Sequence, residues 1–150
     1  MIEGFDRVFG GAGHDLAYGG EGNDAVFGNG GNDTLDAPGG SFGNDRLYGG
    51  SGFDTLYGGV GDDTITGGLN ADIFIFGDGF GHDIITDFHA TNDGEKIDLS
   101  GVLGILDMAD LISLHTNQVN ADVVITYGLG DSIILQGVDL GELDVNDFIF

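Results

Sequence analysis

The chain has 150 residues, enough for one domain or two small ones. It has 26 acidic residues against 3 basic ones, and its net charge of -23 argues against nucleic acid and anionic membranes as partners and favours cations. There is no cysteine, so the sequence provides neither a disulfide framework nor a thiolate metal site. No apolar run reaches the roughly 18 residues of a membrane-spanning helix.

A nine-residue unit, glycine-glycine-x-glycine-x-aspartate-x-apolar-x, repeats through the first half of the chain, most clearly at 49–57 and 58–66. Its position-6 aspartates lie nine residues apart, except where three residues are inserted around 37–39. They are Asp6, Asp15, Asp24, Asp33, Asp45, Asp54, Asp63 and Asp72. This period is typical of a calcium-binding β-helix.

The first six positions of the unit predict a tight turn with oxygen ligands. Glycine at positions 1, 2 and 4 permits positive φ and lets carbonyl oxygens converge. Carbonyl and carboxylate oxygens are the hard ligands that Ca²⁺ takes. Beside the eight aspartates, the candidate ligands are Gly10, Gly11, Ala12, Gly13, Gly19, Gly20, Glu21, Gly22, Gly28, Gly30, Gly31, Gly49, Gly50, Ser51, Gly52, Gly58, Gly59, Val60 and Gly61.

Positions 7 to 9 predict a short strand. Position 8 is apolar in every copy and is predicted to point inward, so that stacked units bury one continuous column. The column is Val8, Ala17, Val26, Leu35, Leu47, Leu56, Ile65 and Phe74. Position 9 points outward and is often aromatic, at Phe9, Tyr18, Phe27, Tyr48 and Tyr57. These rings predict a stacked surface ladder or, alternatively, a docking face for another domain or for sugar rings.

The repeats resemble those of the RTX family of secreted bacterial proteins. The resemblance implies an all-β fold, a right-handed parallel β-roll in which two units make one coil and the turns alternate between two edges. Each ion would then lie between neighbouring turns of one edge, held by an aspartate from each turn and by backbone carbonyls. One edge would stack Asp6, Asp24, Asp45 and Asp63, and the other Asp15, Asp33, Asp54 and Asp72.

Three gaps on each edge allow at most six ions, but several copies are imperfect. Residues 1–3 lack the glycines, Asn29 and Ser41 replace the second glycine, and Asn70 replaces the third. We therefore expect about four to six Ca²⁺ ions. Without metal, carboxylates stacked at the strand spacing of roughly 5 Å repel one another, so metal binding would drive folding. The expected affinity class is extracellular, about 10⁻⁴ to 10⁻³ M.

The nine-residue period stops at Phe76, which divides the chain into a repeat roll (1–76) and a C-terminal region (77–150). Alternating apolar residues predict short strands, a turn at 128–131 predicts a hairpin, and Asp107 predicts the cap of one short helix over 108–115. The predicted strands are 73–76, 83–88, 96–99, 122–127 and 132–135. The segment after the repeats resembles that of serralysin-type secreted proteases, which implies an antiparallel β cap.

The last four residues, 147–150, are one aspartate followed by three bulky apolar residues. This ending resembles that of type I secretion substrates in the same family, although it can equally form the last strand of the cap. The acidic residues Asp78, Asp83, Asp87 and Asp98 either form a further Ca²⁺ site outside the roll or lie in turns and on the surface.

No catalytic residue can be assigned. The zinc-binding His-Glu-x-x-His motif of the protease relatives is absent, and His14, His82, His89 and His115 are scattered. Segment 39–43 fits the glycine-x-serine-x-glycine elbow, but it lies inside the repeats, where chance matches are frequent.

The sequence therefore predicts the Ca²⁺-binding C-terminal part of a larger secreted RTX protein, which folds outside the cell. Its partners would be Ca²⁺, the type I secretion machinery and an upstream catalytic or adhesive domain, because the array opens in mid-unit. The alternative is a module that binds polysaccharide or a surface, as in the R-modules of alginate epimerases, although residues after Phe76 do not look like those modules. A self-standing enzyme is the third interpretation.

Overall fold

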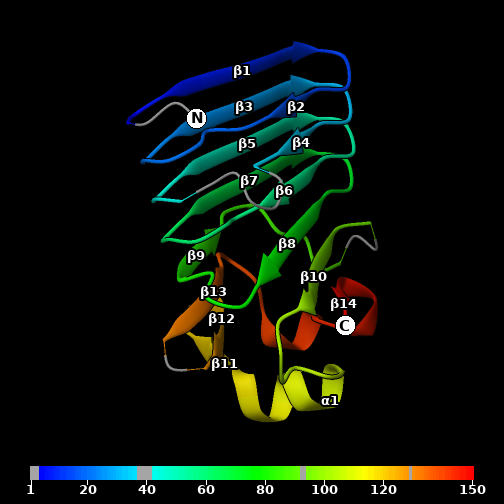
Figure 1. The fold of residues 1–150 in the computed structure, drawn as a ribbon. Coiled ribbons are helices and arrows are strands. Elements are labelled where there is room, and N and C mark those ends of the chain that lie inside the picture. Colours follow the sequence, from blue (N-terminus) through cyan, green and yellow to red (C-terminus); the bar gives the residue numbers. More distant parts are fainter. Residues whose placement is uncertain (1–3, 37–41, 92–93, 129) are drawn as a thin grey trace.

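The computed structural model describes residues 4–36, 42–91, 94–128 and 130–150. Strands in this part of the chain form two sheets that face each other (Figure 1). The 8-stranded sheet contains, in spatial order, β1 (Arg7–Ala12), β3 (Ala25–Gly30), β5 (Arg46–Ser51), β7 (Thr64–Leu69), β9 (His82–Ile85), β13 (Asp131–Leu135), β12 (Asp122–Tyr127) and β11 (Thr116–Val119). The 6-stranded sheet contains β14 (Phe148–Ile149), β10 (Lys96–Gly101), β8 (Ile73–Gly77), β6 (Thr55–Tyr57), β4 (Thr34–Leu35) and β2 (Leu16–Ala17).

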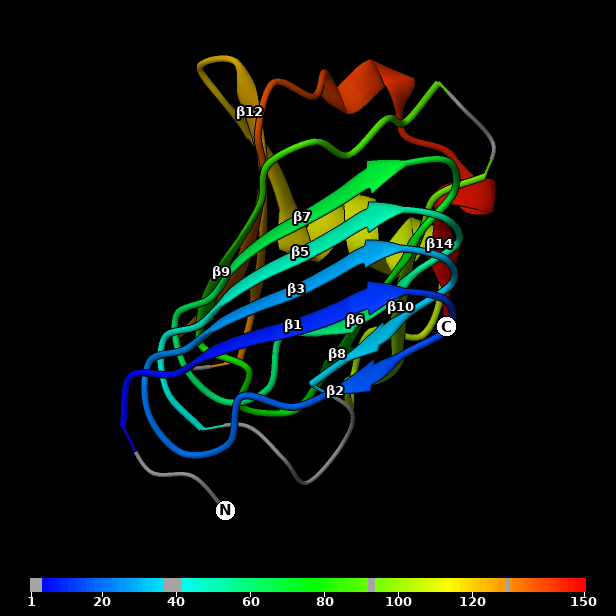
Figure 2. The same ribbon diagram turned by 90° about the horizontal axis from the view of Figure 1, so that it is seen from above.

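From β1 to β10, successive strands alternate between the two sheets, so that two repeat units make one coil, as the family resemblance implies. Figure 2 shows this arrangement from above, with turns joining the sheets at two edges. Equivalent positions of neighbouring coils pair in parallel: Leu47 pairs with Val26 on one side and with Ile65 on the other. The coil register is thus the same before and after the three-residue insertion, which itself lies outside the described residues.

The position-8 side chains form the core of the roll. Val26, Leu35, Leu47, Leu56, Ile65 and Phe74 are completely buried. Val8, in the first coil, is only partly buried because β1 is the outermost strand of its sheet. The buried column extends past the repeats, through Ile85 and Ile97. A column formed by one residue per strand is the core that stacking of otherwise coreless units produces.

The coil continues beyond Phe76. Strand β9 pairs in parallel with β7, and β10 pairs in parallel with β8. The prediction of an antiparallel cap is therefore wrong for these two strands. Among the described strands, antiparallel pairing occurs only further along the chain, between β11 and β12 and between β12 and β13. The division of the chain after residue 76 remains a prediction.

The C-terminal region covers one end of the roll (Figure 1). Strand β13 pairs in parallel with β9, and β14 pairs in parallel with β10. The predicted helix is confirmed as α1 (Met108–Asp110) continued by one wider turn (Leu111–His115), and the Asp107 carboxylate accepts the N–H of Asp110 at 2.9 Å. Short 3₁₀ turns occupy Leu140–Glu142 and Val145–Asp147. Among the described residues, no helix has the length and apolarity needed to cross a bilayer.

Removing one side chain from the column should destabilise the Ca²⁺-loaded roll. We expect Leu56→Ala to lower the free energy of unfolding by about 2 to 5 kcal/mol, because the side chain is fully buried and the stacked coils leave a cavity. Thr55→Ala, one position away and pointing to the outer face, is the matched control. Urea unfolding at saturating Ca²⁺ measures both, and equal effects of the two substitutions would contradict the proposed core.

Candidate metal centre

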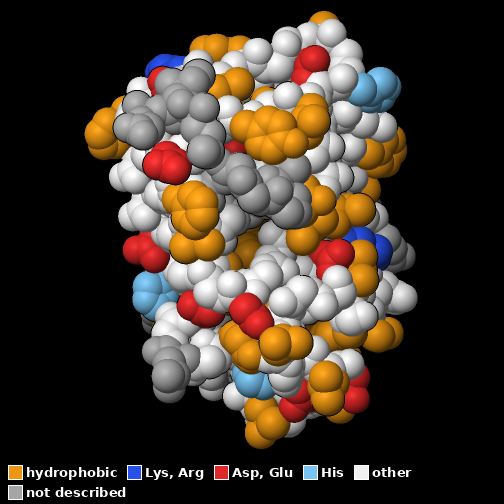
Figure 3. Space-filling view, in the orientation of Figure 1, with side chains coloured by type: hydrophobic (Ala, Val, Ile, Leu, Met, Phe, Trp, Pro, Cys, Tyr) orange, Lys and Arg blue, Asp and Glu red, His pale blue; other side chains and the backbone are white. Residues whose placement is uncertain are grey.

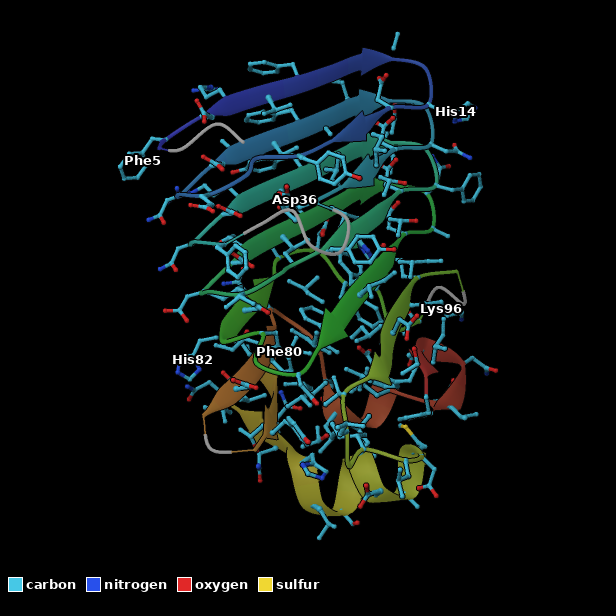
Figure 4. The ribbon with its side chains drawn as sticks, in the orientation of Figure 1. Phe5, His14, Asp36, Phe80, His82 and Lys96 are labelled. Carbon is cyan, nitrogen blue, oxygen red and sulfur yellow. The ribbon has the colours of Figure 1, made fainter. Side chains whose placement is uncertain are left out.

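The turns at the two edges of the roll stack the position-6 aspartates into two columns. We call the turns of Asp6, Asp24, Asp45, Asp63 and Asp83 the first edge, and those of Asp15, Asp33, Asp54 and Asp72 the second edge. Figure 4 shows the labelled Phe5 and His82 on one side of the roll, next to the first-edge turns, and His14 on the opposite side. The structure therefore brings together the two sets of aspartates that the repeat period predicts, and adds Asp83 to the first.

Each aspartate side chain fixes the backbone of the preceding coil. The backbone N–H of one aspartate donates to Oδ1 of the equivalent aspartate in the next coil, at N–O distances between 2.7 and 2.9 Å. The pairs of the first edge are Asp6–Asp24, Asp24–Asp45, Asp45–Asp63 and Asp63–Asp83. Those of the second edge are Asp15–Asp33, Asp33–Asp54 and Asp54–Asp72. We call these two series the aspartate ladders.

The second carboxylate oxygen of each ladder residue is buried and has no hydrogen-bond partner. This holds for Oδ2 of Asp6, Asp15, Asp24, Asp33, Asp45, Asp54, Asp63, Asp72 and Asp83. Burying a polar atom without a partner is costly, and burying a charge without one is more so. A row of such oxygens, aligned at both edges of one protein, is the arrangement that bound cations would satisfy.

Backbone carbonyl oxygens complete the candidate sites. A Cβ placed on Gly10 would lie 3.0 Å from Oδ2 of Asp15 and 3.0 Å from the carbonyl oxygen of Gly28 in the next coil. A Cβ placed on Gly49 would lie 2.5 Å from Oδ2 of Asp54 and 2.5 Å from the carbonyl oxygen of Gly67. A side chain at position 1 would therefore collide with a carboxylate oxygen and a carbonyl oxygen, and glycine allows these two oxygens to converge. This donor set fits Ca²⁺.

Among the described residues, no three His, Asp or Glu side chains gather around one point as a metal centre. Each site would instead combine one or two carboxylates with backbone carbonyls, as the sequence predicts. Asn29 and Asn70, which replace glycines of the motif, adopt φ of 79° and 81°. Asparagine tolerates this left-handed conformation better than most residues, so both turns keep the backbone course of the other copies.

Burial makes five of the ladder carboxylates harder to ionise. It raises the pKa of Asp45 to about 6, of Asp63 and Asp72 to about 7, and of Asp83 to about 8. The N–H group of the preceding aspartate opposes the rise, whereas neighbouring carboxylates increase it. The pKa of Asp54 is also raised, chiefly by burial. A bound cation would reverse this balance by favouring the ionised form.

The structure places four acidic residues in or beside the ladders that the repeat pattern did not assign to them. Asp83 continues the first edge, and its signal was present in the sequence: Gly79, Gly81 and Asp83 keep the spacing of positions 2, 4 and 6, displaced by two extra residues. The buried Asp36 accepts the N–H of Gly19 at 2.7 Å. Asp87 accepts the N–H groups of Gly67 and Gly68, and the buried Glu95 accepts that of His89.

Asp78, Asp83, Asp87 and Asp98 do not form one site. Asp78 accepts the N–H of Leu103 in an exposed turn, and Asp98 accepts that of Ser100. The expectation of a surface position is wrong for Asp83, which is fully buried at the end of a turn. Of the glycine-x-serine-x-glycine segment, residues 39–41 lie outside the described part of the chain.

The aromatic ladder is present on the outer face of the 8-stranded sheet. Ring centroids of Phe9 and Phe27 lie 4.9 Å apart, those of Phe27 and Tyr48 also 4.9 Å apart, and both pairs are nearly parallel. The Arg7 guanidinium lies 5.4 Å from the Phe27 ring centre. Because the rings stack on each other, Phe27 presents its edge to solvent and not its face. A sugar ring packs against an aromatic face, so this geometry favours the structural interpretation of the ladder.

Comparison with known sequences identifies the repeats. The family described as the RTX calcium-binding nonapeptide repeat (4 copies) matches this chain twice, at residues 2–35 and 39–74. The chain carries RTX calcium-binding repeats. The ladder aspartates from Asp6 to Asp72 thus lie in segments that match a family of calcium-binding repeats. A comparison with curated proteins found no significant match.

Solved structures share the fold of this RTX chain. The AlgE6R3 subunit of the Azotobacter vinelandii mannuronan C5-epimerase aligns with a TM-score of 0.57 at 24% identity, over 92% of this chain and 78% of its own. The AlgE6R2 subunit of that enzyme aligns with a TM-score of 0.52 at 23% identity, over 99% and 92%. At this identity the likeness concerns the fold alone. The expectation that residues after Phe76 differ from R-modules is wrong at that level, because the alignments extend through them.

Protonation should partly replace Ca²⁺. The pKa values of Asp45, Asp63, Asp72 and Asp83 are raised above the unfolded value of about 4, so these four carboxylates favour the folded state below that pH and lose this contribution as the pH rises through about 6 to 8. We therefore expect the metal-free chain to show more β-structure at pH 5 than at pH 8. Far-UV circular dichroism in EDTA measures this, and a weaker β signal at the lower pH would contradict it.

The turn backbone should not tolerate a side chain at position 4. Gly52 has a φ of 144°, and a Cβ on it would overlap the carbonyl oxygen of Gly31 in the preceding coil. We expect Gly52→Ala to raise the Ca²⁺ concentration at the folding midpoint severalfold. Gly77→Ala is the control, because a Cβ there meets nothing within 4 Å and the φ is not left-handed. A shared midpoint for both variants would argue against this packing.

Proposed function

We propose that this chain is a Ca²⁺-triggered folding module of a secreted protein, unfolded at cytosolic Ca²⁺ and folded outside the cell. The observation that carries the proposal is the row of buried, unpartnered Oδ2 oxygens along both edges. With no cation these oxygens lose their hydration and gain no partner, so the stacked state is disfavoured. With Ca²⁺ the same oxygens become ligands, and binding free energy becomes folding free energy.

The eight repeat aspartates define six gaps between neighbouring coils, three on each edge. We propose that about four to six of them hold Ca²⁺, with carboxylates from the ladders and carbonyls from the glycine-rich positions as ligands. At a free Ca²⁺ concentration ten times the dissociation constant, each ion adds about 1.4 kcal/mol. Five ions add about 7 kcal/mol, which is comparable to the whole stability of a small domain.

The position of the C-terminus supports a role in export. Strand β14 pairs with β10, and Phe148 is buried against the rest of the cap. The Asp147 carboxylate accepts the N–H of Asp144 at 2.7 Å. A C-terminal signal held in this way is available to a secretion apparatus only while the chain is unfolded. Low cytosolic Ca²⁺ would keep the signal available, and extracellular Ca²⁺ would then fold the chain and bury the signal in the cap.

The R-module alternative has less support. The likeness to the epimerase subunits concerns the fold, and the aromatic ladder presents ring edges. The chain also keeps a net charge of -23 before any ion binds, which disfavours an anionic polysaccharide. The space-filling view in Figure 3 shows acidic side chains in separate patches over one face, with only few basic ones.

A Ca²⁺ titration of the full chain tests the folding switch. From EDTA to about 10 mM Ca²⁺, above the extracellular affinity range, we expect a cooperative change from coil to β-structure in far-UV circular dichroism. Mg²⁺ is the control and should be ineffective, because it demands near-octahedral geometry and retains its water. A chain that is fully folded in EDTA and indifferent to Ca²⁺ would refute the proposal.

A further inference from the structure

A ninth turn of the roll lies beyond the matched repeats, at Gly79–Asp83. The N–H of Gly61 donates to the carbonyl of Phe80 at 3.1 Å, which repeats the contact between the turns of earlier coils. Asp83 is fully buried, and its Oδ1 accepts the N–H of Asp63 at 2.9 Å. Its Oδ2 is buried and has no hydrogen-bond partner. The family match ends at residue 74, so it does not assign this turn.

Two unpartnered carboxylate oxygens converge at this turn. A Cβ placed on Gly58 would lie 3.2 Å from Oδ2 of Asp83 and 3.3 Å from Oδ2 of Asp63. The other charged groups that act on Asp83 are Asp62 and Asp131, which are also acidic. Of the glycines whose surroundings are described, Gly58 is the one at which Oδ2 atoms of two successive coils are both among the nearest atoms.

We propose that Asp63 and Asp83 bind one further Ca²⁺ ion and that this ion fastens the roll to the C-terminal sheet. The proposal rests on the proposed function, since it adds a site to the same array. Its ligands differ from those of the matched repeats, because one carboxylate comes from the second half of the chain. Two carboxylate oxygens that converge beside a glycine are hard ligands suited to Ca²⁺.

The ninth turn is also where the C-terminal sheet attaches. The N–H of Ser132 donates to the carbonyl of Gly81 at 2.7 Å, and that of Gly79 donates to the Asp131 carboxylate at 3.1 Å. Strand β13 pairs with β9 over its length, Leu135 opposite Ile85, and both side chains are completely buried. An ion that orders this turn therefore orders β9, on which β13, β12 and β11 successively depend.

Asp83→Asn in the full chain separates the ion from the hydrogen bond. The amide oxygen still accepts the N–H of Asp63, while the buried negative charge is removed. We expect equilibrium dialysis to find one Ca²⁺ fewer than in the original chain. In EDTA the variant should be no less folded, because it lacks one buried charge. Asp78→Asn is the matched control, with the same change of charge in the same turn, and should leave the ion count unchanged.

Hydrogen exchange tests the fastening. At an intermediate Ca²⁺ concentration, we expect Asp83→Asn to lose protection in β12 and β13. Asp24→Asn, which alters the opposite end of the same edge, should keep it there. Equal protection of these two strands in both variants would overturn the fastening role.

The ion count separates the remaining outcomes. If the original chain binds no Ca²⁺, the proposed function itself fails. If the original chain binds Ca²⁺ and Asp83→Asn binds the same number of ions, the proposed site at the ninth turn is overturned, and Asp83 serves only as a hydrogen-bond acceptor. If Asp83→Asn does not fold at about 10 mM Ca²⁺ while Asp78→Asn does, the result supports the site, because the amide keeps the size of the side chain and its acceptor oxygen but removes the charge and one oxygen ligand.

Discussion

The stacking of the coils depends on the different surroundings of the two oxygens of each ladder carboxylate. Oδ1 accepts the backbone N–H of the preceding coil, as Asp45 does for Asp24, and so fixes the distance and register between coils. Oδ2 is then held in the interior of the turn without a partner. The interaction that stacks the coils thus creates the charge that opposes stacking. A cation between the turns resolves this conflict, which makes the metal a structural part of the roll.

Much of the roll could be predicted because its order is local. A nine-residue period fixes which side chain enters the core, the family resemblance adds which aspartates share an edge, and Leu47 and Asp45 occupy the expected places. The direction of β9 and β10 could not be predicted in the same way. An alternating apolar strand has the same sequence pattern whether it pairs in parallel or antiparallel. In addition, two extra residues at 76–77 interrupt the nine-residue period, so the period alone does not reveal the ninth unit.

Other parts of the site arise from contacts between distant residues. Glu95 stands in register beside Asp72, because Lys96 pairs with Ile73, yet its longer side chain turns to the N–H of His89. Glu95 therefore does not continue the second-edge ladder, although it stands where the next aspartate of that ladder would be. Asp36 occupies an outward position of the repeat but is buried, with a φ of 53°. Nothing in the unit's pattern distinguishes these residues from ordinary surface carboxylates.

Within the described residues, the two ends of the roll differ in how they are covered. At the N-terminal end β1 is the outermost strand, Phe5 and Phe9 are 84% and 58% exposed, and Val8 is only partly buried. At the other end β9 and β10 each have neighbours on both sides, and their core residues Ile85 and Ile97 are fully buried. In a stack stabilised by nearest-neighbour contacts, a coil with one neighbour is the least stable. A coil at the covered C-terminal end already has a neighbour to pack against, so ordering it costs the least free energy. Ca²⁺ binding there would provide the template on which the coils earlier in the sequence stack.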